Sequence, residues 1–296
     1  MSKRNNSMRA GSKGNPASSP AVPEVLQQDQ ESPRPKFSFA VPTEIVELPS
    51  KGRYYPEDHP LYMMDSVEIR YMTAKDEDTL TSKTLLNKGV ALDRFLQGVI
   101  VDQRIKINTL LTGDKNALLV ASRITGYGAD YNTKVQCPNC SSTSDYSFNL
   151  NFCKVDDGSA ILEYVPYEDS KLKKEEPGMF SIILPVTGFS VKFKLLNGHD
   201  ENTLVKRIKT TKEYKKYDTN VTTLFKTIIV SVEGSDDRYA INEFIENMPA
   251  ADSRHLRKTY EVVMPKIDMT QTFICEHCGE ESRLEVPLTA EFFWPK

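Results

Sequence analysis

The sequence predicts an α+β fold in which one small unit is divided in two by a long insertion. Two Cys-x-x-Cys motifs, Cys137 to Cys140 and Cys275 to Cys278, are separated by residues 141–274. The same alternation of apolar side chains follows both motifs, as expected for a strand with one buried face. The chain before and between the motifs combines helical periodicity with a strand pair, and it therefore supplies both classes of element.

The four cysteines of these motifs match the ligand set of a closed tetrahedral zinc site. The two-residue gap allows a tight turn to direct both sulfurs at one ion, so each motif supplies half of the site. Four thiolates leave no open coordination position, which predicts a structural ion rather than a catalytic one. The predicted ligands of this structural Zn²⁺ are Cys137, Cys140, Cys275 and Cys278.

Other interpretations of the cysteines stay open. The sulfurs could be ordinary buried thiols or disulfides, or His277 could replace one cysteine as a ligand. A redox Cys-x-x-Cys normally occurs once, at the start of a helix after a strand, and neither motif has that setting. Cys153 has no partner pattern and is interpreted as a core residue.

Apolar residues recur six, eight and ten positions after the second cysteine of each motif. They are Tyr146, Phe148 and Leu150 in the first half, and Leu284, Val286 and Leu288 in the second. Each half is therefore predicted to consist of a Cys-x-x-Cys motif, called a knuckle below, followed by a short turn and a strand. The two halves are predicted to face each other as a zinc ribbon. A usual ribbon separates its cysteine pairs by about 15–20 residues, so the long intervening segment is an insertion. Closing a flexible loop of this length costs about 4 kcal/mol, whereas a structural zinc contributes about 10–16 kcal/mol.

This reading divides the chain into five parts. Residues 1–36 are rich in Ser, Pro, Gln and charge, and we expect them to be a disordered tail because they cannot bury enough apolar surface. The other parts are a mostly helical domain (37–133), the first half of the ribbon (134–152), an inserted α+β domain (153–268) and the second half of the ribbon with an aromatic C-terminus (269–296).

The elements of the helical domain follow from local signals. In chain order they are an extended stretch over 37–49, a rigid loop over 53–60, a strand over 67–72, a helix capped by residues 73–76, an amphipathic helix through Leu92, Phe95, Leu96 and Val99, and a helix capped by Gly113-Asp114 that ends near Gly126.

The inserted domain is predicted to combine a hairpin with helices. Its elements are a stretch over 160–165, a hairpin of 180–185 with 188–195, a basic helix from Asp200 or Asn202, an apolar helix over 221–232, helices over 239–248 and 251–263, and a return segment over 266–268.

Two surface features suggest partners. The basic helix carries Lys206, Arg207, Lys209, Lys212, Lys215 and Lys216. It is the one stretch that could contact nucleic acid, although acids and threonines interrupt it as on an ordinary exposed face. Phe292, Phe293 and Trp294 form an aromatic terminus that must either dock on its own domain or insert into a partner, and we predict them as partner-binding residues.

Composition limits the classes of function. The net charge is −3, which gives no global basic footprint for nucleic acid. The start of the chain lacks an apolar signal core, and no apolar run of about 18 residues occurs. We therefore expect a soluble protein made in a reducing cytoplasm. The four histidines are scattered and no phosphate loop or nucleophile motif is found, so we expect neither an enzyme nor a small-molecule substrate.

Several stretches together resemble a baseplate protein family of contractile-tailed, T-even-like bacteriophages. They are residues 41–56, 67–78, 89–93 and 248–252, the two cysteine motifs and the terminal Phe292–Pro295. The resemblance covers most of the chain from about Phe37. It implies a component of the baseplate hub or of its assembly, built in the host cytoplasm and acting through contacts with other tail proteins. We expect the chain to be located in the tail baseplate of the virion. An assembly chaperone absent from the mature virion and a zinc-ribbon nucleic-acid-binding protein are the alternatives.

Overall fold

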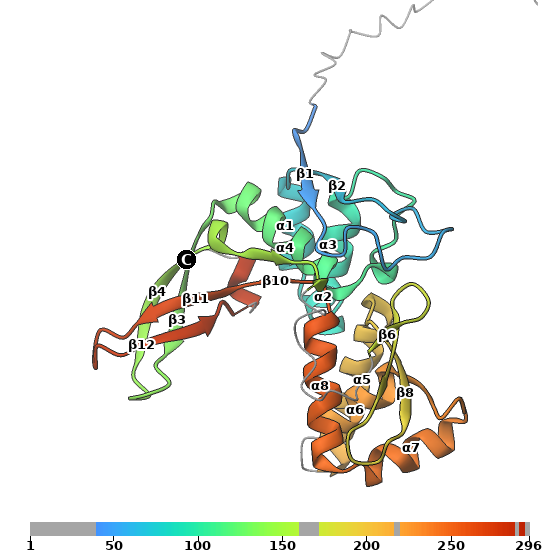
Figure 1. Ribbon diagram of the computed structural model, residues 1–296. Helices are drawn as coiled ribbons and strands as arrows, with labels where there is room; N and C mark the ends of the chain where they lie inside the picture. Colours follow the sequence, from blue (N-terminus) through green and yellow to red (C-terminus); the bar gives the residue numbers. More distant parts are fainter. Residues whose placement is uncertain (1–39, 160–171, 216–219, 288–289, 294–296) are drawn as a thin grey trace, which may run out of the picture. The chain divides into compact units, whose positions relative to one another are not determined.

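The computed structural model describes residues 40–159, 172–215, 220–287 and 290–293 (Figure 1). All elements named below belong to the compact unit Val41–Lys296. Helices and small antiparallel sheets occur together, so the predicted α+β class is confirmed. The tail predicted over 1–36 and the stretch predicted over 160–165 lie outside the described residues.

The N-terminal part begins with a two-stranded antiparallel sheet. Strand β1 (Thr43–Glu47) pairs with β2 (Ser66–Arg70), which is the strand predicted over 67–72. The predicted helix cap is also present, because the Asp76 carboxylate accepts a 2.8 Å hydrogen bond from the Thr73 backbone N–H. The elements that follow are α1 (Ala74–Thr81), α2 (Lys83–Lys88), α3 (Ala91–Val99), the short 3-10 helix η1 (Ile107–Thr109) and α4 (Thr112–Tyr127).

Two details of these helices differ from prediction. In α3, Phe95, Leu96 and Val99 are buried as expected, but Leu92 in the first turn is exposed and the smaller Ala91 is buried instead. In α4, Asp114 is not a cap. The helix starts after Leu111, and Asp114 lies in its first turn with long-range partners that local sequence does not reveal.

The buried Asp114 carboxylate joins α4 to the loop between β1 and β2. It accepts hydrogen bonds from the Ser50 backbone N–H (2.9 Å), the Ser50 hydroxyl (2.6 Å) and the Tyr55 hydroxyl (2.7 Å). Burial raises the pKa of Asp114, while the Ser50 and Tyr55 donors act in the opposite direction. Burial makes the largest contribution to a raised pKa of Tyr55, and the charge of Asp114 makes the next largest. The Tyr55 hydroxyl therefore keeps the proton that it donates.

The inserted segment contains the predicted hairpin within a larger sheet. Four antiparallel strands run in the order β6 (Lys173–Lys174), β7 (Met179–Ile183), β8 (Ser190–Lys194) and β9 (Ile229–Val232). The apolar helix predicted over 221–232 is wrong in its last turn, because residues 229–232 form an edge strand against β8. The β-branched residues Ile229, Val230 and Val232 suit a strand better than a helix. The helices are α5 (Gly198–Lys215), α6 (Asn220–Ile228), α7 (Arg238–Asn247) and α8 (Ala250–Val263).

The two ends of this segment are adjacent. Strand β5 (Lys154–Asp156) pairs antiparallel with β10 (Lys266–Asp268), so the chain leaves and returns through one small sheet. Strand β10 packs on α4, where a Cβ atom at Gly113 would lie 1.9 Å from the Pro265 carbonyl oxygen. Only glycine permits so close an approach at the start of α4.

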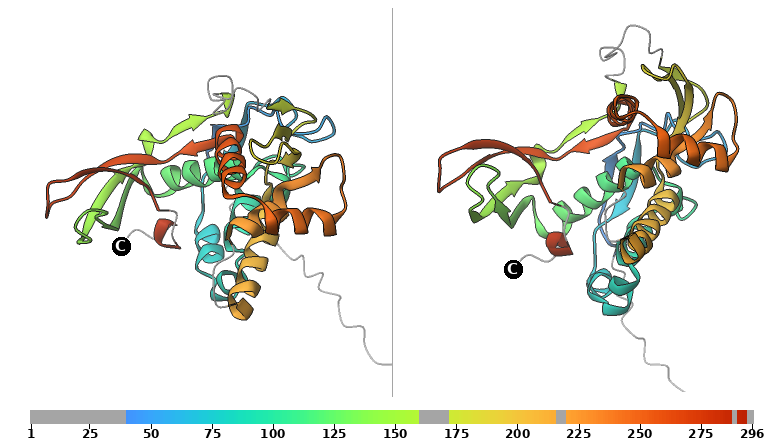
Figure 2. Two further views of the ribbon diagram at one scale, coloured as in Figure 1. Left: turned by 60° about the horizontal axis from the view of Figure 1, so that its bottom comes forward. Right: turned by 90° about the horizontal axis from the view of Figure 1, so that it is seen from below.

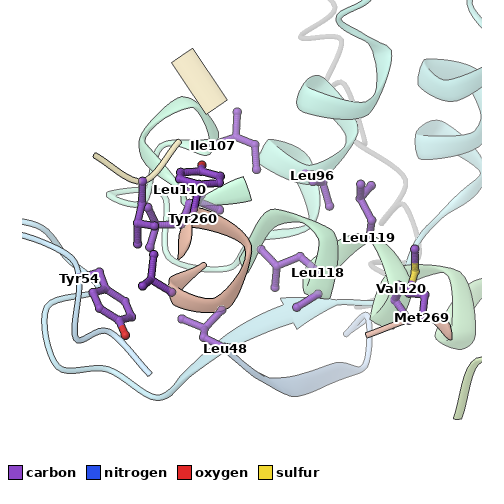
Figure 3. Close-up of a cluster of buried hydrophobic side chains, with 14 of the residues drawn as sticks. Leu48, Tyr54, Leu96, Ile107, Leu110, Leu118, Leu119, Val120, Tyr260 and Met269 are labelled. Carbon is purple, nitrogen blue, oxygen red and sulfur yellow. The ribbon is translucent and has the colours of Figure 1, made fainter. Parts of the chain in front are cut away.

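One hydrophobic core runs through the N-terminal helices and the inserted segment. In Figure 3, Tyr260 of α8 lies beside Ile107 and Leu110, and Leu118 of α4 lies nearby. The Tyr260 hydroxyl accepts a hydrogen bond from the Leu196 backbone N–H at 3.2 Å. Over the described parts of the chain, no helix is both long and apolar enough to span a bilayer.

Replacing Asp114 with Ala is expected to lower the free energy of unfolding by about 2–4 kcal/mol, because three buried donors lose their acceptor. Urea unfolding followed by circular dichroism measures this change. The control is Asp236→Ala at an exposed position, where a change within about 0.5 kcal/mol is expected. Equal effects of the two substitutions would show that the Ser50–Asp114 contact does not stabilise the fold.

Candidate metal centre

Two β-hairpins carry the cysteine motifs at their turns. Strand β3 (Asp130–Gln136) pairs with β4 (Thr143–Asn149), and β11 (Thr270–Ile274) pairs with β12 (Glu281–Glu285). The sequence predicted a strand after each motif, and the structure shows a strand on both sides of each. The hairpins, green and red, lie side by side in Figure 1 and in both views of Figure 2.

The two knuckles have the same backbone geometry. In the first, Cys137 donates from its N–H to the Ser142 carbonyl (2.8 Å), and its own carbonyl accepts from the Ser141 N–H (2.9 Å). In the second, the corresponding bonds join Cys275 to Glu280 (3.0 Å) and to Gly279 (2.9 Å). Ser141 and Gly279 both adopt positive φ, 58° and 70°, so each turn requires a left-handed residue at the same place.

The four sulfur atoms converge. They all lie within 4.8 Å of one another. The Cys137 and Cys278 sulfurs are 3.8 Å apart, and the Cys140 and Cys275 sulfurs are 3.7 Å apart. A tetrahedron with Zn–S bonds of about 2.3 Å has edges of about 3.8 Å, whereas a disulfide joins its sulfurs at about 2.05 Å. The spacing therefore suits a shared ion and not a covalent bond, and all five cysteines are free thiols.

Polar groups lie next to three of the four sulfurs. The Ser142 hydroxyl lies 2.9 Å from the Cys140 sulfur and 3.5 Å from the Cys275 sulfur. The Asn139 side-chain amide lies 3.9 Å from the sulfur of Cys278. Such neighbours orient ligands and supply donors to thiolates.

These contacts shift the pKa values of the thiols in different directions. The Ser142 hydroxyl, and then the Cys278 backbone N–H, lower the pKa of Cys275 to about 6. The same hydroxyl lowers the pKa of Cys140. The Glu280 backbone N–H lowers the pKa of Cys278. Desolvation and the neighbouring sulfurs act in the opposite direction, and together these effects raise the pKa of Cys278 to about 11. Four thiolates this close repel one another, so a divalent cation is what allows all four to be charged together.

Side chains behind the knuckles join the hairpins to each other. The Tyr146 ring lies 5.0 Å from the Phe273 ring at 71°, and its hydroxyl donates to the Thr272 carbonyl at 3.0 Å. The Gln271 side chain donates to the Asn149 carbonyl (2.9 Å) and accepts from the Asn149 N–H (3.3 Å). The predicted inward faces are correct for Tyr146, Phe148, Leu150, Leu284 and Val286, which are buried or half-buried in the core, and Leu288 lies outside the described residues.

His277 and Cys153 do not join the group of sulfurs. His277 is exposed between its neighbouring cysteines. Cys153 is half-buried against the core, and burial raises the pKa of its thiol. The structure therefore separates Cys153 from the four converging cysteines, as its sequence context predicted.

The aromatic terminus docks inside the protein. Phe292 and Phe293 lie in the 3-10 helix η4 (Ala290–Phe293) and are each only 2% exposed. The Phe293 ring meets Phe95 of α3 edge-on at 5.3 Å, and the Phe292 ring meets Tyr131 of β3 edge-on at 5.1 Å. The structure thus shows the first of the two alternatives for these rings, and Trp294 lies outside the described residues. A contact of these two rings with a partner would require η4 to leave this position.

Arg123 holds this terminus in place, a role that its local sequence context does not predict. Its guanidinium is buried and donates to the carbonyls of Phe292 (2.7 Å), Gly128 (2.7 Å) and Asp130 (3.2 Å). Burial lowers the pKa of Arg123, while Tyr127 and Tyr131 oppose the shift. The available signal was a basic residue within the apolar run of α4, after Leu118, Leu119 and Val120.

The fold and the site define a class: an α+β protein whose two distant hairpins bring four cysteines together in an arrangement compatible with a structural metal site. The chain matches the family model described as T4 bacteriophage base plate protein over residues 41–294. It belongs to this family of T4-like phage baseplate proteins, as the resemblance of its motifs implied. Comparisons with curated proteins and with solved structures give no match.

Family membership makes the chain a structural protein of the phage tail baseplate. It also suggests that its contacts are with other tail proteins. The matched range includes both cysteine knuckles and η4, so the hairpins belong to the family region.

Removing either half of the cysteine group is expected to have the same effect. Cys137→Ser/Cys140→Ser and Cys275→Ser/Cys278→Ser should each lose about one zinc per chain and lower the melting temperature sharply, because a half site cannot close a tetrahedron. Elemental analysis and thermal unfolding measure the two effects. Cys153→Ser is the matched control and should keep the metal. Zero metal in the purified unaltered chain would contradict the assignment.

Phe292→Ala and Phe293→Ala are each expected to lower the free energy of unfolding by about 3–5 kcal/mol, because each ring fills a closed position in the core. Urea unfolding measures the loss. Phe152 is 69% exposed, and Phe152→Ala should change stability by less than about 0.5 kcal/mol. Losses below about 1 kcal/mol at both core positions would mean that the docked rings contribute little to the fold.

Proposed function

We propose that this protein is a structural component of the hub of a contractile phage tail baseplate, in which zinc fastens two distant chain segments into one rigid surface. The family match over residues 41–294 supports the baseplate role, and the position in the hub is the finer part of the proposal. The convergence of four sulfurs within 4.8 Å supports the role of zinc. The chain acts through protein contacts and not through catalysis.

Zinc is the ion that suits this site best. Four thiolates at tetrahedral spacing favour zinc or an iron–sulfur centre over calcium or magnesium, which prefer oxygen ligands. Two Cys-x-x-Cys knuckles with exposed tips at Cys140 and Cys278 are typical of a structural zinc ribbon. The ion adds a link between hairpins that are also joined by contacts of Tyr146 and Gln271.

The pairing of β5 with β10 supports the predicted division of the chain. Lys154 and Asp268 are partners in this sheet, as are Asp156 and Lys266. The segment between them therefore starts and ends at one place, which is what an insertion into the ribbon (134–152 and 269–296) requires. With its ends held together, the segment over 153–268 adds little loop-closure cost to metal binding.

The charge of the hairpins argues against the nucleic-acid alternative. From Asp130 to Asn149 and from Thr270 to Glu285, the basic residues are Lys134 and Arg283. The acidic residues are Asp130, Asp145, Glu276, Glu280, Glu281 and Glu285. Four thiolates around one divalent ion would add two further negative charges. A nucleic-acid surface needs the opposite sign of charge.

The test is quantitative peptide mass spectrometry of purified phage particles and of the infected lysate, together with zinc analysis of the purified protein. We expect peptides of this chain in particles at a small fixed ratio to a major tail protein. Their absence from particles while the chain is abundant in lysate would favour the assembly chaperone. A salt-sensitive affinity for DNA or RNA would favour the nucleic-acid alternative.

A further inference from the structure

The loop between β1 and β2 presents three large apolar side chains to solvent. Tyr62, Met63 and Met64 are 39%, 63% and 50% exposed, and together they are called the apolar tip below. The preceding Leu61 is buried and fixes the base of the tip. Single exposed apolar residues are common on protein surfaces, but three in succession on one turn are not explained by packing. The tip lies in the blue loop after β1 in Figure 1.

The backbone of the apolar tip is held rigidly. All four N–H groups from Leu61 to Met64 have acceptors. The acceptors are the His59 ring Nδ1 (3.1 Å), the His59 carbonyl (2.9 Å), the Gly52 carbonyl (3.1 Å) and the Leu61 carbonyl (3.1 Å). Met63 adopts a φ of 55°, a left-handed conformation that a bulky side chain rarely takes. A flexible surface loop would relax from this conformation, so the surrounding contacts enforce it.

Those contacts lead back to the buried core. Gly52 has a φ of 68°, and a Cβ there would lie 2.3 Å from the Met64 backbone nitrogen, so the tip packs directly on this glycine. The Gly52 N–H donates to the Ser50 hydroxyl at 3.1 Å, and Ser50 is bonded to the buried Asp114 of α4. The apolar tip is therefore fixed through Gly52 and Ser50 to the central helix.

A second line of contacts holds the other side of the loop. The His59 ring stacks on Tyr55 at 4.4 Å, and Tyr55 donates to the same Asp114. The His59 Nδ1 accepts from the Leu61 N–H, which leaves its Nε2 as the donor to the Thr109 hydroxyl at 2.8 Å. The loop thus has its shape before any partner arrives, which lowers the entropy cost of binding.

The charges around the apolar tip indicate what it fits. Glu57, Asp58 and Asp65 are exposed beside it. The two basic residues that flank Gly52 are Lys51 and Arg53, and both are instead paired with Asp157 at 3.1 and 2.6 Å. The tip therefore combines an apolar centre with an acidic rim, and its complement is an apolar pocket edged with Lys or Arg. A membrane surface with anionic lipids would repel this rim.

We propose that the apolar tip is a preformed docking element that inserts into an apolar pocket with a basic rim on another tail protein. This inference rests on the proposed function because it takes the partner from the baseplate. Methionine side chains suit such a contact, since they are flexible and polarisable enough to adapt to a pocket.

The first test places the photo-crosslinking residue p-benzoyl-phenylalanine at Met63 in full-length chain supplied to infected cells. Irradiation followed by peptide mass spectrometry identifies the partner. We expect a crosslink to one other tail protein, at a site with apolar residues and a nearby Lys or Arg. The same residue at Tyr239, a 79% exposed position on α7, is the control and should give at least tenfold less of that product. A crosslink to a second copy of this chain or to lipid would overturn the proposal, and so would the absence of any crosslinked product.

The second test measures infectious particles made when variants complement a phage that lacks this gene. Tyr62→Ser/Met63→Asn/Met64→Ser removes the apolar surface, and Asn tolerates the left-handed backbone at Met63. The yield should fall at least tenfold, while the melting temperature stays that of the unaltered chain. Phe152→Ser/Tyr239→Ser removes exposed rings from two other elements and should keep the yield. Equal losses for both variants, or none for the tip variant, would overturn the proposal.

These outcomes are separable from failure of the proposed function. If the chain were absent from mature particles, the Met63 crosslink to a tail protein would still form in the lysate, and the tip would then serve an assembly factor. If the chain were present in particles without such a crosslink, the baseplate role would stand and the docking element would be wrong.

Discussion

The meeting of the two cysteine knuckles is the constraint on which the arrangement of this protein depends. Each knuckle can fold its own turn, but neither can bind an ion alone, so the residues between Cys140 and Cys275 must bring their ends together. The pairing of β5 with β10 does this from within the fold. The sulfur spacing of 3.7 and 3.8 Å then leaves a place for one tetrahedral ion. The metal would thus complete an approach that backbone pairing has largely prepared, and this favours tight binding at low conformational cost.

Helix α4 anchors several segments that are distant from it in the chain. Near its start, Asp114 fixes the β1–β2 loop through Ser50 and Tyr55, and Gly113 admits the backbone before β10. Near its end, Arg123 holds η4 and the start of β3 through backbone carbonyls. Both charged groups are buried, so each acts as a fixed anchor for segments that are distant in the chain. A charge buried in this way stabilises only the arrangement that supplies all of its hydrogen-bond partners.

Rigidity is a property that a baseplate protein can use directly. A subunit that works through contacts must keep its contact surfaces in fixed relation, and here three distant elements are tied to one core: the hairpin pair, η4 and the apolar tip. The hairpins are acidic, and the tip is apolar with an acidic rim. Both features favour partners with basic surfaces and disfavour nucleic acid as the principal ligand.

The sequence by itself determined the fold class, the four converging cysteines and most helix and strand positions, because these depend on local periodicity and on a ligand spacing that few other sites share. The capping of α1 by Thr73 and the β7–β8 hairpin were predictable for the same reason. Only the tertiary structure decided that residues 229–232 form an edge strand. It also decided that Asp114 accepts a hydrogen bond from Ser50 instead of capping its helix, and that the Phe292 carbonyl accepts one from Arg123. Each of these outcomes depends on a partner far away in the chain. Local propensity is worth at most about 1 kcal/mol per residue, and a buried hydrogen bond or packed ring from a distant segment outweighs it.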